Sequence, residues 1–499
     1  MKNFLKSKFL VVATAALAFG ACTDLKTTEP DSVLLPVSST GFSKVDPGKF
    51  LGTLYQSLGT FTDQASIFCL QEHPSDELIP PTRGVDWGDN GVWRTLDGHT
   101  WDPTHSFNNS TWNTIHGNAY KCNQVLASDP TPAQKAEAQF FRALYMSYAM
   151  DFWGQVPFRE VTQGVDDLPK VLSRSEAFDF IVADLKAALP LLPATGPTAK
   201  NSKITQAAAN TLLARLMLNK AVYKAAAPSA TYTYDAGDMN ECIKYCDAVT
   251  AAGYSLEPKY FDNFSTASKT EVIFTSAEGS PSNRWYMTLH YDQDPSGWNG
   301  FTTISEFYDK FKDGDQRKGF PAKKDKSANA GIGLGFLVGQ QYNNDGTILV
   351  DHRSNKPLQF TPDVPLAGAA TDKGIRAIKY HPATAGQYII LRYGDVFTMK
   401  MEAQFRGGTG GAAAALITAN ALRAVRGASV LTVPLDANTV LDERGREMYW
   451  EGVRRMDQIR FGVFHTHASV VNKDVARCLY PIPADAVSSN ANLKQNAGY

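Results

Sequence analysis

The sequence predicts a mainly α fold: a tetratricopeptide-like scaffold of helical hairpins that carries long irregular loop excursions and a few short β-strands. Residues 132–153 show a helical pattern that is apolar on more than one side, and such a helix must be covered by more than one neighbour. Further helical segments of similar length are joined by short turns, which is typical of stacked helix-hairpin repeats. Unpatterned segments rich in Gly, Asp and Trp separate some of these helices.

The stretch 132–157 gives the strongest helix signal. Thr131 can cap the helix, and Pro132 fits its first turn. Gly154 and Pro157 stop it, because neither residue continues a helix well. We therefore expect a buried helix at the centre of the scaffold.

Other segments show helical or strand patterns. Helical periodicity predicts helices over 47–61, 112–126, 173–189, 205–223, 239–252, 395–405, 412–426 and 442–461. The helix at 173–189 opens with a capping box, Ser173 and Glu176. Short strands are expected over 272–276, 347–350 and 388–391. Two excursions without a period, near 76–109 and 278–390, are expected to be ordered loops.

The N-terminus predicts export. Lysines precede a short apolar core at 9–20, which is too short to span a bilayer. Residues 1–21 therefore indicate a secretory signal peptide. The segment also resembles a bacterial lipoprotein signal, in which Cys22 is lipidated and becomes the new N-terminus; ordinary cleavage with Cys22 incidental is the alternative. The polar segment 22–45 is expected to be a tether.

Charge and motif content exclude several classes of function. Lys+Arg 49 against Asp+Glu 50 gives almost no net charge, which argues against nucleic acid as a partner. Beyond Cys22 an odd number of cysteines remains, so they cannot all pair, and we expect buried free thiols. No nucleophile elbow, phosphate loop or zinc motif occurs. The sequence therefore indicates a non-enzyme without cofactor or metal.

Three carboxylates near the C-terminus could suggest catalysis. Glu443, Glu447 and Glu451 are four residues apart and interleaved with arginines. Two of them could act as acid and base in a glycosidase. Such a series along one helix is more often a charge network, with Asp442–Arg446 and Glu451–Arg455 as i,i+4 pairs. We expect the structural role.

Four blocks of the chain, in this order, resemble those of one protein family. They are Ala138-Gln-Phe-Phe-Arg-Ala-Leu to Phe152-Trp-Gly-Gln-Val-Pro157, Leu391-Arg-Tyr-Gly-Asp-Val to Met401-Glu-Ala403, Glu443-Arg-Gly-Arg-Glu-Met-Tyr-Trp-Glu-Gly to Arg460-Phe-Gly462, and Tyr480-Pro-Ile-Pro to Tyr499. Together with the lipoprotein start, they make the chain similar to the SusD/RagB lipoproteins, with 46–499 as one SusD-like domain.

The resemblance implies a function. Members of this family are surface lipoproteins of a Bacteroidetes-type outer membrane that cover a SusC-type TonB-dependent transporter. They capture a nutrient, usually an oligosaccharide, and deliver it to the channel. One alternative is a RagB-like uptake protein that binds peptide. The other is a surface glycoside hydrolase that uses the carboxylates described above.

Aromatic residues in the two excursions are the candidate ligand contacts. An exposed indole can stack on the C–H face of a sugar, while carboxylates and a guanidinium take the hydroxyl groups. The first excursion offers Arg83, Asp86, Trp87 and Asp89, and the second offers Trp285, Tyr286, Trp298 and Tyr342. Trp93, Trp101 and Trp112 are expected to pack on the scaffold instead.

Overall fold

The structure is a computed structural model that describes residues 41–163, 167–198 and 200–499. The chain divides into two units, Met1–Pro36 and Val37–Tyr499, and all the described residues belong to the second unit. The predicted signal peptide, Cys22 and most of the predicted tether lie outside the described residues.

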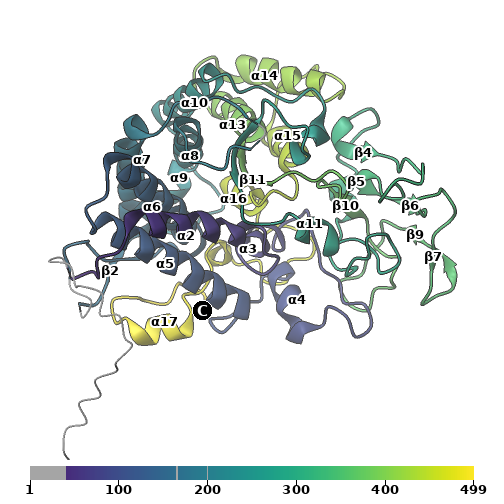
Figure 1. Cartoon of the computed structure of the whole chain (residues 1–499), viewed down its shortest axis with the longest axis horizontal. Coiled ribbons are helices and arrows are strands. Elements are labelled where there is room, and N and C mark those ends of the chain that lie inside the picture. The colour runs from purple at the N-terminus through teal and green to yellow at the C-terminus, as the bar shows by residue number, and fades with distance from the viewer. Residues whose placement is uncertain (1–40, 164–166, 199) are drawn as a thin grey trace, which may run out of the picture. The chain divides into compact units, whose positions relative to one another are not determined.

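Helices make up most of the regular structure of this unit (Figure 1). Their bounds are α2 Pro47–Ser57, α3 Ile67–Glu72, α4 Val92–Asp97, α5 Ser106–Leu126, α6 Pro132–Trp153, α7 Arg174–Ala188, α8 Gln206–Leu218, α9 Lys220–Tyr223, α10 Ala236–Ala251, α11 Asn283–Tyr286, α12 Ser305–Tyr308, α13 Tyr393–Phe405, α14 Gly411–Val425, α15 Ala437–Met448, α16 Arg454–Arg460 and α17 Ala484–Ser489.

The helix ends follow the predicted capping chemistry. Thr131 and Gln134 form a capping box at the start of α6, and Pro132 occupies its first turn. Gly154 ends α6 with φ 69°, a left-handed conformation that glycine adopts at low cost. Ser173 and Glu176 form the predicted capping box of α7.

The helices pack as neighbouring pairs. The most extensive helix contacts join α5 to α6, α6 to α7, α8 to α10, and α13 to α14. Because α6 lies between two partners, most of its side chains are buried. The mainly α, tetratricopeptide-like prediction is confirmed. In Figure 1, these helices lie on the left and at the top, and the short strands β4, β5, β6, β7, β9 and β10 lie on the right.

The strands are short and form small antiparallel sheets. Their bounds are β1 Val156–Phe158, β2 Lys170–Leu172, β3 Val272–Ser276, β4 Gly319–Phe320, β5 Leu334–Leu337, β6 Gly339–Gln340, β7 Val350–Asp351, β8 Lys356–Pro357, β9 Gln359–Phe360, β10 Arg376–Ile378 and β11 Tyr388–Arg392. The sheets are β1-β2, β10-β5-β4, β11-β3, β6-β9 and β7-β8. The predictions at 272–276 and 388–391 are confirmed, whereas the one at 347–350 shares only Val350 with β7.

The first predicted loop holds more structure than expected. Helix α4 lies inside 76–109, and α5 begins at Ser106. The tail after Tyr480, for which no helix was expected, contains α17. Conversely, the helix predicted over 47–61 is α-helical only as far as Ser57, where α2 ends. The remaining residues, Leu58–Phe61, form a 3-10 helix.

The single long helix predicted over 442–461 is wrong in its continuity: helices α15 and α16 cover most of this range, and the chain breaks between them. Trp450 and Gly452 have φ of 57° and 76°, which no α-helix contains. The backbone N–H of Trp450 donates to a carboxylate oxygen of Glu77 at 3.0 Å, and that of Gly452 donates to Glu72. Buried carboxylates from the α3 region therefore replace the helical hydrogen bonds at the break.

The break also changes the ion pairs predicted along this segment. Asp442 pairs with Lys310 and Arg446 with Glu443, each at 2.6 Å. Arg455 points to Asp151 at 2.6 Å and does not meet Glu451. The i,i+4 pairs predicted here are therefore wrong, but the charge network itself is confirmed.

Two further predictions concern buried groups. Cys69, Cys122, Cys242, Cys246 and Cys478 are all buried and free, as expected. Trp93, Trp101 and Trp112 are buried in the core, also as expected. Within the described residues, no helix combines the length and apolar character needed to cross a bilayer.

Candidate functional site

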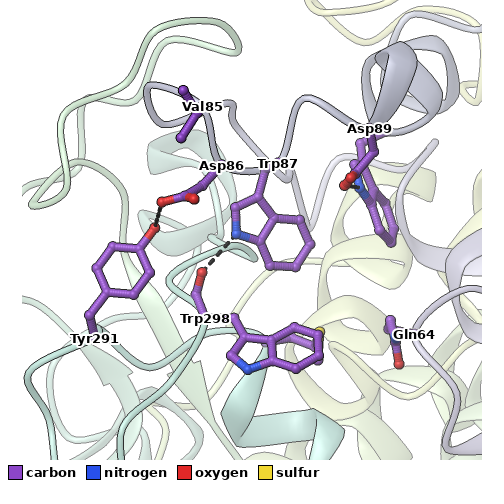
Figure 2. A pocket seen from close by; sticks show the side chains of 9 residues that line it. Gln64, Val85, Asp86, Trp87, Asp89, Tyr291 and Trp298 are labelled. Carbon is purple, nitrogen blue, oxygen red and sulfur yellow. Dashed lines mark hydrogen bonds between the residues drawn. The ribbon is translucent and has the colours of Figure 1, made fainter.

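A cavity of ≈ 530 Å³ opens where the two predicted excursions meet (Figure 2). The residues that line it come from 64–93 and 287–298: Gln64, Val85, Asp86, Trp87, Asp89, Trp93, Met287, Tyr291 and Trp298. Four of the predicted contacts, Asp86, Trp87, Asp89 and Trp298, are thus brought together from positions about 200 residues apart in the sequence.

Trp87 forms the back of the cavity. Its φ is 62°, a left-handed conformation that a bulky residue adopts only when its surroundings hold it. Its ring centroid lies 5.4 Å from those of both Trp93 and Phe301. A Cβ atom at Gly300 would overlap the indole, so glycine is required there for the ring to lie against the backbone.

Trp298 supplies the second indole. Its side chain is 55% exposed, which is unusual for a tryptophan, and its ring lies below Trp87 in Figure 2. Two hydrogen bonds fix its backbone: its N–H donates to the Tyr286 carbonyl at 2.6 Å, and its carbonyl accepts from Nε1 of Trp87 at 2.7 Å. The backbone is therefore held in place while the ring faces solvent.

An acidic corner lies beside the two indoles. The hydroxyl of Tyr291 donates to Oδ2 of Asp86 at 2.5 Å, and Arg353 donates to the same oxygen at 2.9 Å. The Arg353 guanidinium also lies 3.9 Å from the Tyr291 ring centroid. The hydrogen bond from Tyr291, joined by Arg353, lowers the pKa of Asp86, so this carboxylate is ionised at neutral pH. Burial and the Asp86 carboxylate raise the pKa of Tyr291 to about 12.

The other side of the cavity carries a second carboxylate and an amide. Asp89 accepts a hydrogen bond from Nε1 of Trp93 at 2.7 Å, which joins it to the core below. The side-chain oxygen of Gln64 accepts from Asn283 at 2.9 Å, and this orients the Gln64 NH₂ group. The cavity therefore offers a donor opposite its acidic corner.

The structure corrects the expected positions of Arg83 and Trp285. Arg83 is 2% exposed, and its guanidinium donates to the carbonyls of Asn299 and Lys373 at 2.6 and 2.7 Å. It fastens the loop on which Trp87 lies and does not face the cavity. Trp285 is 8% exposed because α11 turns it into the core.

Tyr286 and Tyr342 do not line the cavity either. Tyr286 follows Trp285 in α11 and is partly exposed, but its side chain is not among the lining residues. Tyr342 lies in a separate cavity of ≈ 330 Å³ with Phe320 and Phe336. The ammonium group of Lys324 lies 3.8 Å from the centroid of its ring.

Three polar residues near the site were not predicted from the sequence, and neither was Met287, which lines the cavity. Tyr291 lies in the predicted second excursion, so its composition could have drawn attention to it. Gln64 and Arg353 carry no local signal, because only the folding of distant segments brings them to the site.

This arrangement suits a neutral polyhydroxylated ligand. Two indoles provide apolar faces, and carboxylates with an amide provide acceptors and donors at the rim. The pairing of Asp86 with Arg353 leaves the corner without a large unbalanced charge. An α-helical scaffold that presents such a cavity from its loops has the form of a ligand-binding protein.

Comparison with known proteins places the chain in a family. The model of the SusD family matches residues 251–499, and the model described as "Starch-binding associating with outer membrane" matches residues 82–218. The chain belongs to the SusD/RagB family.

Relatives and solved structures agree with this assignment. The chain is 25% identical over 433 residues to the starch-binding protein SusD of Bacteroides thetaiotaomicron, an alignment that covers 74% of this chain and 73% of SusD. A SusD-like protein from Bacteroides fragilis superposes with a TM-score of 0.68 at 21% identity, over 91% of this chain and 96% of that chain. Surface glycan-binding protein A from Bacteroides thetaiotaomicron, in complex with laminarihexaose, gives a TM-score of 0.63 at 18% identity, over 90% and 98% of the two chains. These structures establish the fold.

Proposed function

We propose that this protein is a cell-surface glycan-binding lipoprotein of the outer membrane. It binds an oligosaccharide in the cavity between Trp87 and Trp298 and delivers it to a SusC-type transporter. The observation that carries the proposal is the pairing of an anchored indole with an exposed one in a cavity rimmed by polar groups. Starch binding by a relative that aligns with three quarters of the chain supports the ligand class.

The ligand contacts divide into two kinds. Trp298 stacks on one sugar ring, and Trp87 forms the wall against which the next ring packs. Asp86 and Asp89 accept hydrogen bonds from sugar hydroxyls, and Gln64 donates one. Arg83 acts at a distance from the ligand by holding the turn that carries Trp87.

The proposal assigns no reaction to the protein. Glu443 and Glu447 are buried among arginines and do not line the cavity. Burial opposes ionisation of Glu443, but Arg317, Arg446 and Arg423 outweigh it and lower the pKa of Glu443 to about 2. A carboxylate held in its ionised form is a poor general acid. At the cavity, the hydrogen bond from Tyr291, joined by Arg353, likewise keeps Asp86 ionised.

Attachment to the membrane follows from the N-terminus. In this proposal residues 1–21 are removed, Cys22 carries the lipid, and the tether to residue 45 lifts the domain 46–499 from the membrane surface. The family model that names association with the outer membrane supports this location. The transporter is the partner that the family resemblance implies.

A binding screen tests the ligand class. The mature protein, with Cys22 replaced by serine to keep it soluble, is applied to an array of α- and β-glucans, xyloglucan fragments and a peptide library. The proposal predicts saturable binding to at least one oligosaccharide family, lost when both Trp87 and Trp298 are changed to alanine. Binding to peptides alone would show a RagB-like ligand, and release of shorter sugars that depends on Glu447 would show a hydrolase.

A further inference from the structure

Three side chains of types that can bind a metal ion come together from segments that also supply the acidic corner of the cavity. His290, Asp292 and Asp351 each offer one ligand atom, and these atoms all lie within 4.8 Å of one another. His290 and Asp292 flank Tyr291, whereas Asp351 ends strand β7, 59 residues further along the chain than Asp292. The sequence gives no spacing signal for this site, because two separate segments build it.

The cluster contains a buried nitrogen without a partner and a buried carboxylate without a cation. The side chain of His290 is fully buried, yet its Nε2 has no hydrogen-bond partner among the described residues. Asp351 is 2% exposed and accepts three hydrogen bonds, from the hydroxyls of Thr371 and Ser354 at 2.6 and 2.9 Å and from the backbone N–H of Arg353 at 2.9 Å. Within the described part of the chain, these contacts of its carboxylate include no lysine or arginine side chain. These three hydrogen bonds stabilise the ionised carboxylate, so the site presents a buried negative charge that a bound cation would neutralise.

Asp292 brings a second histidine to the same place. One of its carboxylate oxygens contacts Nδ1 of His352, and the other lies 3.4 Å from Nδ1 of His290. The backbone N–H of His352 also donates to Asp292 at 3.2 Å. Two histidines and two aspartates therefore converge from the segments 290–292 and 351–352.

We propose that His290, Asp292 and Asp351 bind one divalent transition-metal ion of the Zn²⁺ or Mn²⁺ class. Imidazole nitrogen together with carboxylate oxygen is the donor set that these ions prefer, whereas Ca²⁺ and Mg²⁺ favour sites built from oxygen alone. His352 contacts Asp292 and thereby holds that carboxylate in position, without binding the ion itself.

The position of this site links it to the cavity. Tyr291 lies between two of the ligands, and Arg353 lies two residues after the third. Both residues donate to Asp86 at the cavity. An ion that joins the two segments would therefore fix the acidic corner. This consequence rests on the proposed function, but the metal site itself does not.

Metal titration tests the site directly. Zn²⁺ is titrated into the metal-stripped protein by calorimetry, and Mn²⁺ binding is followed by electron paramagnetic resonance. The wild type is expected to bind one ion, and Asp351→Asn and Asp292→Asn are each expected to weaken binding by about tenfold or more. Asp345→Asn changes an exposed aspartate outside the cluster and is expected to leave binding unchanged. Thermal unfolding of each variant confirms folding.

Three outcomes would overturn the proposal: no saturable binding, binding that survives both cluster variants, or equal loss in Asp345→Asn. Because Asp292 is only half-buried, its variant keeps the test valid if Asp351→Asn does not fold. Oligosaccharide binding is then measured with and without Zn²⁺. One-site metal binding without glycan binding would support the metal site and refute the proposed function, and the reverse result would refute the metal site alone.

Discussion

The indole nitrogen of Trp87 donates a hydrogen bond to the backbone carbonyl of Trp298 at 2.7 Å, which ties together two residues 211 positions apart. This bond joins the two excursions at the point where the cavity opens. It also uses the polar atom of Trp87, so that its remaining surface is an apolar wall. The cavity therefore depends on how closely the backbone near Trp298 can approach the ring of Trp87.

Gly300→Ala tests that approach. The new methyl group would overlap the Trp87 ring, so we expect the indole to move and oligosaccharide affinity to fall at least tenfold, measured by calorimetry. Gly52→Ala is the control, because nothing lies within 4 Å of its added methyl group in α2. The control should keep full affinity and gain about 0.5–1 kcal/mol of stability. Full affinity in Gly300→Ala would show that the Trp87 wall is not needed.

Tyr291→Phe tests the acidic corner. Removal of the hydroxyl deletes the hydrogen bond that contributes most to the lowered pKa of Asp86, so this pKa should rise toward its ordinary value. A ¹³C-carboxyl NMR titration measures the pKa in the wild type and the variant. We also expect the affinity of the variant for oligosaccharide to begin its acid-induced loss at a higher pH than that of the wild type. An unchanged Asp86 pKa would contradict this account of the corner.

We expect the protonation of Glu72 to make the free energy of unfolding depend on pH. Burial raises the pKa of Glu72 to about 7, and burial together with Glu72 raises the pKa of the neighbouring Glu77, so between about pH 4.5 and 7 the folded protein holds on this pair protons that the unfolded chain releases. The free energy of unfolding should therefore fall as pH rises through this range, by roughly 1–3 kcal/mol.

Urea unfolding at pH 5 and pH 8 measures this effect. In Glu72→Gln, which has no proton to lose and no longer raises the pKa of Glu77, the fall in stability should be clearly smaller, whereas Glu306→Gln at an exposed position should behave as the wild type. Equal pH dependence in the wild type and Glu72→Gln would show that other groups cause it.

Glu447→Gln tests the buried charge network between α15 and the rest of the fold. Oε1 of Glu447 lies 2.8 Å from guanidinium nitrogens of both Arg392 and Arg426, and all three side chains are buried. Neutralising the carboxylate removes one negative charge from the network, although Glu271 still pairs with both arginines, so we expect a loss of about 3 kcal/mol in the free energy of unfolding. Asp313→Asn, which breaks an exposed pair with Lys318, should cause no measurable change.

The scaffold could be predicted from the sequence because local patterns specify it. The caps at Thr131 and Ser173 and the apolar faces of the helices act within a few residues. The break at Trp450 was missed, because the groups that stabilise it, Glu72 and Glu77, lie nearly 380 residues away in the sequence.

The candidate site was predicted only in part, because local sequence patterns do not show how distant loops pack together. Composition identified the two excursions, and Trp87 and Trp298 do line the cavity. Composition alone could not show that Arg83 and Trp285 turn inward, since burial depends on the packing of distant loops. Nor could it show that Tyr291 and Arg353 meet at Asp86.

Calorimetric titration of Trp298→Ala tests the central claim most directly. The Trp298 side chain is largely exposed, so its loss should leave the fold intact, and Phe320→Ala provides an exposed aromatic control outside the cavity. One stacked aromatic contributes on the order of 1 kcal/mol or more. With the oligosaccharide that binds best in the array, we predict an affinity at least tenfold weaker for Trp298→Ala and unchanged for Phe320→Ala. Wild-type affinity in Trp298→Ala would contradict the account.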